Sequence, residues 1–177
     1  GYEILGSEDI LKDLLEENSS LKIFIAIGDN FIRNKVFNEI IKIVPNIEFI
    51  SAIHPKSVIG KGVKIGKGTC VMAGSVINSD TKVGDFCIIN TNSSLDHDCI
   101  MEDYTSLAPN SVTGGNVKIG KFSSISISTT VKHGITIGKH SIIGAGSVLL
   151  NNCGDNLILY GIPAKEIRKR KIGERYL

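Results

Sequence analysis

The sequence lacks the features that mark several large classes of protein. No apolar run approaches the length of a membrane span. No secretory signal is visible, so we expect a cytoplasmic protein. The net charge is only +2, and the total charge therefore gives no indication of a nucleic-acid partner. The four cysteines show no CxxC spacing, which argues against a redox or metal role for them.

What the sequence does contain is a six-residue period that runs through residues 53–154 without an insertion or a deletion. A hexapeptide period of this length indicates a parallel β-helix. With three hexads per coil, the segment would form between five and six coils of 18 residues, stacked about 4.8 Å apart. Only Thr113 among the residues that lead the hexads is not aliphatic; the others are Ile53, Ile59, Ile65, Val71, Ile77, Val83, Ile89, Leu95, Met101, Leu107, Ile119, Ile125, Val131, Ile137, Ile143 and Leu149.

Each place in the hexad is expected to have its own structural task. The aliphatic lead would point into the solenoid, and Gly, Asn or Asp in second place would tolerate the backbone angles of a corner. Cys87, Cys99 and Cys153 share the fifth place, which elsewhere holds small or β-branched residues. We therefore interpret these cysteines as packing residues.

Residues 1–50 alternate helical and extended patterns and predict half of a small Rossmann-like unit. Ser7 is the expected cap of a first helix, and residues 22–27 have the pattern of a buried strand. A second helix would end at Pro45, before a short strand at 47–50. The unit begins with a helix and lacks a glycine-rich first turn. We therefore expect residues 1–50 to form a partial α/β domain that is truncated at its N-terminus.

The solenoid domain is expected over residues 51–154, and residues 155–177 would form a C-terminal cap and tail. Residues 160–165 would turn the chain, and residues 166–175 are predicted to form a short polar helix that caps the solenoid. Lys and Arg cluster in this segment. A solvated tail and a phosphate-binding role are both open for it.

Several short motifs, taken together with the hexads, resemble one family of enzymes. The runs at 143–148 (IGAGSV) and 161–165 (GIPAK) resemble the hexapeptide-repeat acyltransferases. Further motifs resemble the branch that contains sialic acid O-acetyltransferases and the bacillosamine-pathway N-acetyltransferases of UDP-linked 4-amino sugars. These motifs are residues 25–30 with Arg33, 53–55, 89–91, 96–98 and 115–117.

The resemblance implies a mainly β protein built on a left-handed parallel β-helix. Handedness does not follow from the hexads themselves, because general chirality rules favour right-handed parallel crossovers. The resemblance also implies a homotrimer with active sites between subunits, a nucleotide-sugar substrate and no metal. Acetyl-CoA would be the co-substrate, lying in the groove between neighbouring coils.

The same resemblance assigns the chemistry to a few residues. His97 matches the family's general base, and histidine suits this task because its pKa lies near the working pH. Asp98 matches the carboxylate that supports the base, with Asp96 as the other possible partner. Gly115 lies 18 residues after His97, so a three-hexad coil places it directly above, and the family uses this glycine to contact the thioester. Asn90 matches a residue that orients the sugar amine.

The remaining assignments concern the outer parts of the two ligands. The resemblance implies that residues 1–50 are a nucleotide-sugar-binding domain, and Gly28 belongs to its expected substrate-binding site. Besides Gly115, the positions that match the cofactor groove are Ser106, Ile127, Ala145, Pro163, Lys165 and Arg168. Ser106 departs from the family, which has histidine at the matching position. The basic side chains near the end of the chain could reach a CoA phosphate.

The other histidines raise the question of a zinc site. His133 lies 36 residues after His97, a spacing that resembles the γ-class carbonic anhydrases, which share the fold. Their third ligand would fall at Gly138, and catalytic zinc needs three protein ligands. We therefore expect no metal site. His54 is interpreted as a turn residue at the start of the repeat, and His140 as a solvated corner.

The favoured function is acetyl-CoA-dependent N-acetylation of a UDP-linked 4-amino-deoxy-sugar, by direct transfer with a histidine base. Two alternatives stay open. The first is O-acetylation of sialic acid or a related sugar, which would use the same residues. The second is a catalytically inactive trimeric solenoid that serves as an assembly platform.

Overall fold

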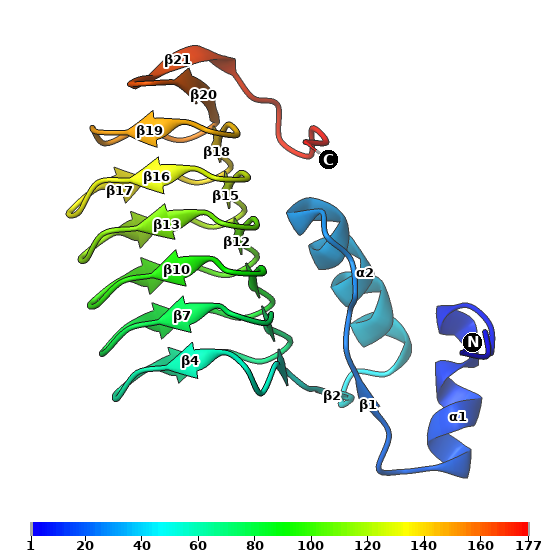
Figure 1. The fold of residues 1–177 in the computed structure, drawn as a ribbon. Coiled ribbons are helices and arrows are strands. Elements are labelled where there is room, and N and C mark those ends of the chain that lie inside the picture. Colours follow the sequence, from blue (N-terminus) through cyan, green and yellow to red (C-terminus); the bar gives the residue numbers. More distant parts are fainter. Residues whose placement is uncertain (1, 177) are drawn as a thin grey trace.

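The computed structural model describes residues 2–176 and consists mainly of a parallel β-solenoid (Figure 1). The chain passes in turn through three sheets of short stacked strands and climbs from β3 to β21. It makes about six left-handed turns. The left-handed β-helix that the resemblance implied is therefore confirmed.

Each strand pairs with the strand one coil away, as Ser94 does with Val76 and with Val112, so a coil contains 18 residues. Sheet 1 contains β3 (Ala52–Ile53), β6 (Cys70–Val71), β9 (Ile88–Ile89), β12 (Ser106–Leu107), β15 (Ser124–Ile125), β18 (Ile142–Ile143), β20 (Leu157–Gly161) and β21 (Ala164–Lys169). Sheet 2 contains β4 (Val58–Ile59), β7 (Val76–Ile77), β10 (Ser94–Leu95), β13 (Val112–Thr113), β16 (Thr130–Val131) and β19 (Val148–Leu149). Sheet 3 contains β5 (Lys64–Ile65), β8 (Lys82–Val83), β11 (Ile100–Met101), β14 (Lys118–Ile119) and β17 (Thr136–Ile137).

The hexad leads form the interior of the solenoid. Ile77, Ile89 and Leu95 are completely buried, whereas the leads of the first coil are less covered, with Ile53 48% exposed. The one polar lead, Thr113, is buried as well, and its hydroxyl accepts a hydrogen bond from the N–H of Asp96 at 3.2 Å. The break in the aliphatic pattern thus supports the corner that carries His97.

The corners correct one expectation about the hexad. Left-handed backbone falls on the fourth place, as at Asn92 and Asp98, both with φ 56°, and not on the second. Second-place glycines are required for a different reason. A Cβ on Gly120 would lie 2.7 Å from the backbone carbon of Gly138 in the next coil, so the spacing between coils excludes a side chain there.

The cysteines confirm their interpretation as packing residues. Cys87 and Cys99 are completely buried, and Cys153 is 8% exposed. The Sγ of Cys87 lies 3.3 Å from Oγ1 of Thr105, one coil above. Burial raises the pKa of the Cys87 thiol to about 11, which keeps it protonated and unreactive.

The N-terminal unit follows the predicted order of elements but is less regular. It contains a 3-10 turn η1 (Glu8–Ile10), α1 (Leu11–Glu17), β1 (Lys22–Ile23), α2 (Asn30–Ile43) and β2 (Glu48–Phe49). The predicted strand at 22–27 is reduced to two residues, because residues 24–27 have no paired strand in the described part of the chain. β1 and β2 form a two-stranded parallel sheet, which does not confirm the Rossmann-like unit.

The two helix starts of this unit differ. Ser7 lies at the N-cap position, as predicted, but its hydroxyl donates to the carboxylate of Asp9 at 2.7 Å and makes no cap hydrogen bond. Asp29 does cap α2, since its Oδ1 accepts from the N–H groups of Phe31 and Ile32, both at 2.9 Å. Such a cap contributes about 1 kcal/mol. The start of α2 is therefore well fixed.

α2 packs against the solenoid corner that joins sheets 3 and 1. There Phe86, Tyr104 and Phe122 stack from coil to coil, with ring centroids 5.1 and 5.4 Å apart. Phe37 of α2 approaches the Phe86 ring to 4.8 Å. This aromatic junction holds the N-terminal unit against sheet 1 (Figure 1).

The C-terminal segment contradicts the predicted helix at 166–175. Residues 166–169 belong to β21, which pairs in antiparallel fashion with β20 and so extends sheet 1. β20 offers an open backbone edge, whereas the segment has no apolar face at helical spacing that would stabilise a helix. The tail then returns toward α2 (Figure 1), where the hydroxyl of Tyr176 accepts a hydrogen bond from the N–H of Asn30 at 3.3 Å.

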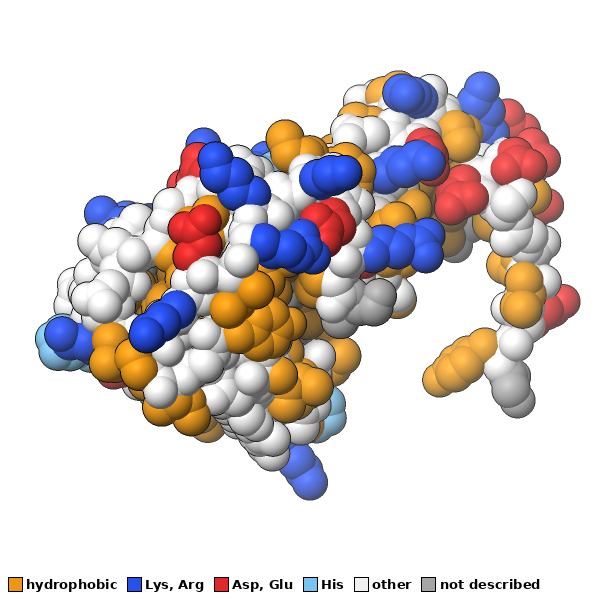
Figure 2. Space-filling model, turned by 90° about the horizontal axis from the view of Figure 1, so that it is seen from above, with side chains coloured by type: hydrophobic (Ala, Val, Ile, Leu, Met, Phe, Trp, Pro, Cys, Tyr) orange, Lys and Arg blue, Asp and Glu red, His pale blue; other side chains and the backbone are white. Residues whose placement is uncertain are grey.

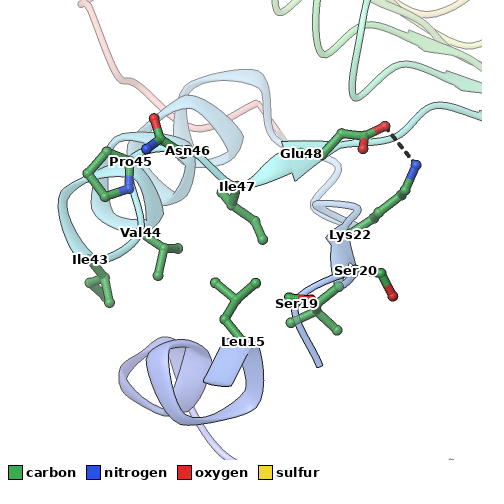
Figure 3. Close-up of a pocket in the computed structure, with 11 residues that line it drawn as sticks. Leu15, Ser19, Ser20, Lys22, Ile43, Val44, Pro45, Asn46, Ile47 and Glu48 are labelled. Carbon is green, nitrogen blue, oxygen red and sulfur yellow. Dashed lines mark hydrogen bonds and ion pairs between the residues drawn. The ribbon is translucent and has the colours of Figure 1, made fainter. Parts of the chain in front are cut away.

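A pocket of about 540 Å³ lies within the N-terminal unit, between the ends of α1 and α2 (Figure 3). Leu15, Val44 and Ile47 line it, and an exposed ion pair between Lys22 and Glu48, 2.9 Å long, lies at its rim. None of the residues expected to act in catalysis or binding lines this pocket. Neither α1 nor α2 is long and apolar enough to cross a membrane.

Candidate active site

His97 lies at the corner between sheets 2 and 3, immediately after β10. Its Nδ1 is 2.8 Å from Oδ2 of Asp98, and its side chain is 54% exposed. Asp98 occupies the fourth place of the hexad with φ 56°. This left-handed backbone turns the short aspartate side chain back toward the ring of the preceding residue. Of the two carboxylates expected beside His97, Asp98 is therefore the one that contacts its ring.

Asp96 has a separate task at the same corner. Its Oδ1 accepts hydrogen bonds from the side-chain amide of Asn78, one coil below, at 2.7 Å and from the backbone N–H of His97 at 2.9 Å. These bonds lower the pKa of Asp96. Asp96 therefore fixes the backbone of the corner, and Asn78 is a contributor that the sequence did not single out.

Asp98 also sets the protonation of the imidazole. The hydrogen bond from Nδ1 to Asp98 raises the pKa of His97 above its ordinary value, and the negative charges of Asp96 and Asp98 act in the same direction. With Nδ1 directed to the carboxylate, Nε2 is left free toward solvent. A neutral His97 can therefore accept a proton at Nε2 while Asp98 stabilises the resulting imidazolium.

Gly115 lies directly over this imidazole, as its spacing predicted. A Cβ on Gly115 would lie 2.5 Å from Nε2 of His97. The two coils are joined at this point by the hydrogen bond from the N–H of Asn116 to the carbonyl of His97, at 2.9 Å. The absence of a side chain at Gly115 therefore lets the imidazole of His97 lie directly against the backbone of this glycine.

Gly28 and Asn90 come from different units but line the same cavity. This cavity of about 200 Å³ lies between residues 24–28 and the coils of β6 and β9. Its walls are largely apolar and include Cys70, Met72 and Ile88. The sequence did not predict that Gly28 and Asn90 lie in one cavity, because their proximity depends on how the N-terminal unit packs on sheet 1.

The cavity and the base lie on different corners of one coil. Asn90 follows β9 at the corner between sheets 1 and 2, whereas His97 follows β10 at the next corner. A side of the coil separates them, roughly 15 Å at the usual rise per residue of a strand. One chain alone therefore does not bring its Asn90 next to its own His97.

The expected cofactor residues fall into two groups. Ile127, 54% exposed, and Ala145 stack at the same corner as Asn90, where the N–H of Gly146 donates to the carbonyl of Ile127 at 2.8 Å. Ser106 is elsewhere. It is only 7% exposed, and its hydroxyl is bound to Ser124 at 2.9 Å within the junction with α2. Burial in this junction removes Ser106 from the exposed corner that Ile127 and Ala145 share.

The basic residues at the end of the chain lie on the hairpin of β20 and β21. Pro163 is in its turn, and Lys165 and Arg168 are exposed on β21. Seen from above, Lys and Arg side chains are spread over this end of the molecule among acidic ones (Figure 2). Arg168 is engaged by Glu174 through both ends of its guanidinium.

The other histidines are not arranged for metal binding. His133 is exposed two coils above His97, and His54 is exposed at the first corner, where its Nδ1 accepts from the N–H of Lys56. His140 is not a solvated corner as predicted, because its ring stacks on Phe122 at 4.7 Å; burial, with Arg170 nearby, lowers its pKa. Within residues 2–176, no group of three His, Cys, Asp or Glu side chains could hold a metal ion.

Solved structures with this architecture show what the chain is similar to. A mutant perosamine N-acetyltransferase from Caulobacter crescentus, in complex with CoA and GDP-perosamine, is 35% identical with a TM-score of 0.85, over 91% of this chain and 76% of that chain. The acetyltransferase domain of PglB from Neisseria gonorrhoeae, in complex with acetyl coenzyme A, is 28% identical with a TM-score of 0.88, over 94% and 80%. WeeI from Acinetobacter baumannii, 24% identical with a TM-score of 0.75 over 94% and 79%, shares the fold.

Family descriptions match the two parts of the chain separately. The bacterial transferase hexapeptide (six repeats) matches residues 116–151, and the PglD N-terminal domain matches residues 1–40. No curated protein sequence gives a significant match. The 35% identity over most of both chains, together with these two matches, identifies the family. The chain belongs to the hexapeptide-repeat sugar acetyltransferases, in the group that carries a PglD-type N-terminal domain.

Proposed function

We propose that this protein transfers the acetyl group of acetyl-CoA to the amine of a nucleotide-linked 4-amino sugar. The observation that carries the proposal is the corner of His97, where Asp98 lies 2.8 Å from Nδ1 and the imidazole lies against the backbone of Gly115. Acyl transfer requires a base, a donor to the developing oxyanion and a held thioester. This corner offers the first two within one pair of coils.

In the proposed reaction, the sugar amine attacks the thioester carbon and its proton passes to Nε2 of His97. Asp98 stabilises the imidazolium that forms. The backbone N–H of Gly115 donates to the oxyanion, the C–S bond breaks, and the thiolate of CoA takes the proton from the His97 imidazolium as it leaves, which restores the neutral base. No acyl-enzyme forms, because the amine is the only nucleophile the step needs.

CoA is proposed to lie along the corner that carries Ile127 and Ala145, with its phosphates toward Lys165, Arg168 and the turn at Pro163. The exposure of Ile127 supports this, since its apolar side chain, 54% exposed, offers a contact surface for the cofactor at this corner. Ser106 is not part of the proposed CoA site, because its hydroxyl is hydrogen-bonded to Ser124 inside the junction with α2.

The active form is proposed to be a homotrimer with sites between subunits. The outward residues of sheet 2 are all uncharged, whereas those of sheet 3 include three lysines. The sheet 2 residues are Val58, Val76, Ser94, Val112, Thr130 and Val148. Packing of this face on a neighbour would also bring the His97 corner of one subunit toward the Asn90 corner of the next.

The nucleotide is the finer question. The resemblance favours a UDP-linked sugar, whereas the relative with 35% identity was solved with GDP-perosamine, which supports a GDP-linked substrate as the second candidate. Release of the CoA thiol should be measured with GDP-perosamine, a UDP-linked 4-amino-4-deoxyglucose and free sialic acid. Turnover with a 4-amino sugar is expected. Turnover with sialic acid alone would replace the proposal by O-acetylation. No turnover and no CoA binding by calorimetry would favour the inactive platform.

Sharing of the site between subunits can be tested by complementation. His97→Ala and Asn90→Ala homotrimers should each have low activity. If the two residues serve one site from different subunits, trimers reassembled from a mixture should regain part of the wild-type rate. Reassembled mixtures that stay as inactive as the parents would exclude a shared site.

A further inference from the structure

Arg33 is a buried cation that the proposed chemistry does not use. Its side chain is 1% exposed, although arginine is almost never fully buried without a partner. No carboxylate in residues 2–176 forms an ion pair with it. Burial lowers the pKa of Arg33. A buried charge is tolerated where every donor finds an acceptor, and the acceptors of Arg33 are informative.

The guanidinium joins the two units of the molecule. On one side, its Nε donates to the backbone carbonyl of Phe86 at 2.9 Å. On the other, Nη1 donates to the carbonyls of Ile27 and Gly28, at 2.7 and 3.0 Å. Nη2 donates to Oδ1 of Asn30. All three nitrogens are therefore used, and the bonds span the junction from the solenoid to residues 27–28.

The two ends of this bridge differ in rigidity. Phe86 is a fourth-place corner residue with φ 54°, completely enclosed and stacked between coils. Residues 24–28 have no ladder partner in the described part of the chain, because β1 ends at Ile23. The guanidinium thus ties a weakly supported segment to a fixed point of the solenoid.

Asn30 completes the connection one turn earlier on α2. Its amide nitrogen donates to the carbonyl of Ser123 at 3.1 Å and lies 3.3 Å from the hydroxyl of Ser106, while its Oδ1 accepts from Arg33. Asn30 is 1% exposed. The pair therefore holds the start of α2, and the segment before it, against sheet 1.

The segment that Arg33 holds is a wall of the cavity shared by Gly28 and Asn90. Arg33 itself also lines this cavity. We infer that Arg33, supported by Asn30, is a positioning residue that sets the wall formed by residues 27–28 opposite Asn90, and thereby the binding of the acceptor sugar. This inference rests on the proposed function. Arg33 would act through the backbone it holds and would not take part in acetyl transfer.

Lysine is the informative replacement. A lysine keeps the positive charge, but its three donors leave from a single nitrogen and cannot reproduce the planar fork. Arg33→Lys should therefore bind one carbonyl and release the others. Misplacement of a binding group by about 1 Å can cost about 10²-fold in rate, so we expect the KM for the acceptor to rise about 10- to 100-fold in Arg33→Lys and in Arg33→Met.

The experiment compares kinetic constants in the full chain. KM and kcat are measured with GDP-perosamine and with a UDP-linked 4-amino-4-deoxyglucose, CoA affinity by calorimetry, and Tm by scanning calorimetry. Ile40→Val is the matched control, because Ile40 is buried in the N-terminal unit but does not line the cavity. The control should lower Tm and leave the acceptor KM unchanged. Both Arg33 variants should raise the acceptor KM and leave CoA affinity as in the wild type.

The possible failures are distinct. Absence of turnover by the wild type with every acceptor would remove the proposed function and the inference together. An active wild type with an unchanged acceptor KM in Arg33→Lys would overturn the inference alone. A loss of CoA affinity in step with the acceptor KM would show general disorder and would also overturn it. If Arg33→Met does not fold, Arg33→Lys still decides.

Discussion

The coils of the solenoid and the sheet of the N-terminal unit both use strands of two residues, yet these strands are stabilised very differently. Each strand of the inner coils has equivalent neighbours 18 residues before and after it, as β10 does, so one coil templates the next. Within residues 2–176, β1 and β2 pair only with each other, and an isolated pair of strands is marginal in water. Two-residue strands are thus stable where the repeat supplies neighbouring strands. Where it does not, they depend on packing against other parts of the molecule.

This difference divides the expected functions. The solenoid fixes the base, the glycine above it and the exposed corner of Ile127 at intervals set by the coil. The N-terminal unit reaches the cavity near Asn90 only through the aromatic junction and Arg33. We therefore expect changes in the solenoid corner to alter kcat, and changes in the N-terminal unit to alter acceptor binding.

The largest expected effect tests the solenoid half of this division. His97→Ala removes the base while leaving an exposed corner whose backbone is held by Asp96. General-base catalysis contributes about 10²–10⁴ in rate, so kcat should fall by that factor. Steady-state kinetics on the full chain would measure it, with circular dichroism as the check of folding. A folded His97→Ala variant with near-normal kcat would refute the assignment.

The next effect compares the cores of the two regions. Leu95 is completely buried among its repeats, and Ile40 is 4% exposed in the N-terminal unit. Replacing either by alanine should cost about 2–5 kcal/mol. Leu95→Ala should lower the transition of the solenoid itself, whereas Ile40→Ala should loosen the N-terminal unit and leave CoA binding intact. Calorimetric unfolding with and without CoA separates the two. A single transition shifted equally by both variants would show that the regions unfold as one.

The same difference explains which parts of the fold were accessible from the sequence. The hexads predicted the solenoid correctly because every coil repeats the same local pattern, as the lead residues Ile77 and Leu95 illustrate. The predicted helix at 166–175 failed because β20 presents an open edge, a tertiary opportunity that no local pattern records. The predicted strand at 22–27 is present but is shortened to β1, because residues 24–27 have no paired strand among the described residues.

A smaller effect is expected from Gly115→Ala. Its new methyl group would lie 2.5 Å from Nε2 of His97 and must displace the imidazole. A shift of this size should lower kcat by about 10²-fold. Gly134→Ala is the matched control, since a Cβ there meets nothing within 4 Å but the backbone has φ 70°. The control should lose about 1 kcal/mol of stability and keep its kcat. Equal kcat for the two variants would contradict the need for a residue without a side chain beside the imidazole at Gly115.

The candidate site was predictable where it follows the coil and unpredictable where it crosses units. The stacking of Gly115 over His97 is a matter of 18 residues. In contrast, Ser106 was assigned to the cofactor by position alone, and it lies inside the junction because α2 covers sheet 1 there. Arg33 carried part of the resemblance without a role. Its importance depends on the carbonyl of Phe86, which is distant in sequence and invisible as a side-chain motif.

The smallest expected effect concerns the partner of the base. Asp98 is in left-handed backbone, which asparagine also adopts readily, so Asp98→Asn should fold normally. The hydrogen bond to Asp98 raises the pKa of His97. Replacing the carboxylate by a neutral amide should therefore lower the pKa of His97 toward its ordinary value. Because the neutral imidazole is the active base, the acidic limb of the kcat/KM profile should move to lower pH. The plateau should also fall, since the imidazolium formed in the transition state loses its countercharge.

Asp96→Asn supplies the comparison that makes this shift interpretable. The Oδ1 of Asp96 accepts hydrogen bonds from the side chain of Asn78 and from the backbone N–H of His97. Asp96 influences the imidazole ring only through its charge. Its replacement should therefore move the acidic limb less than Asp98→Asn does. A larger shift in Asp96→Asn would make Asp96 the working partner of the base. The base would then be oriented by the residue that fixes the corner, and the left-handed backbone at Asp98 would be a matter of solenoid geometry alone.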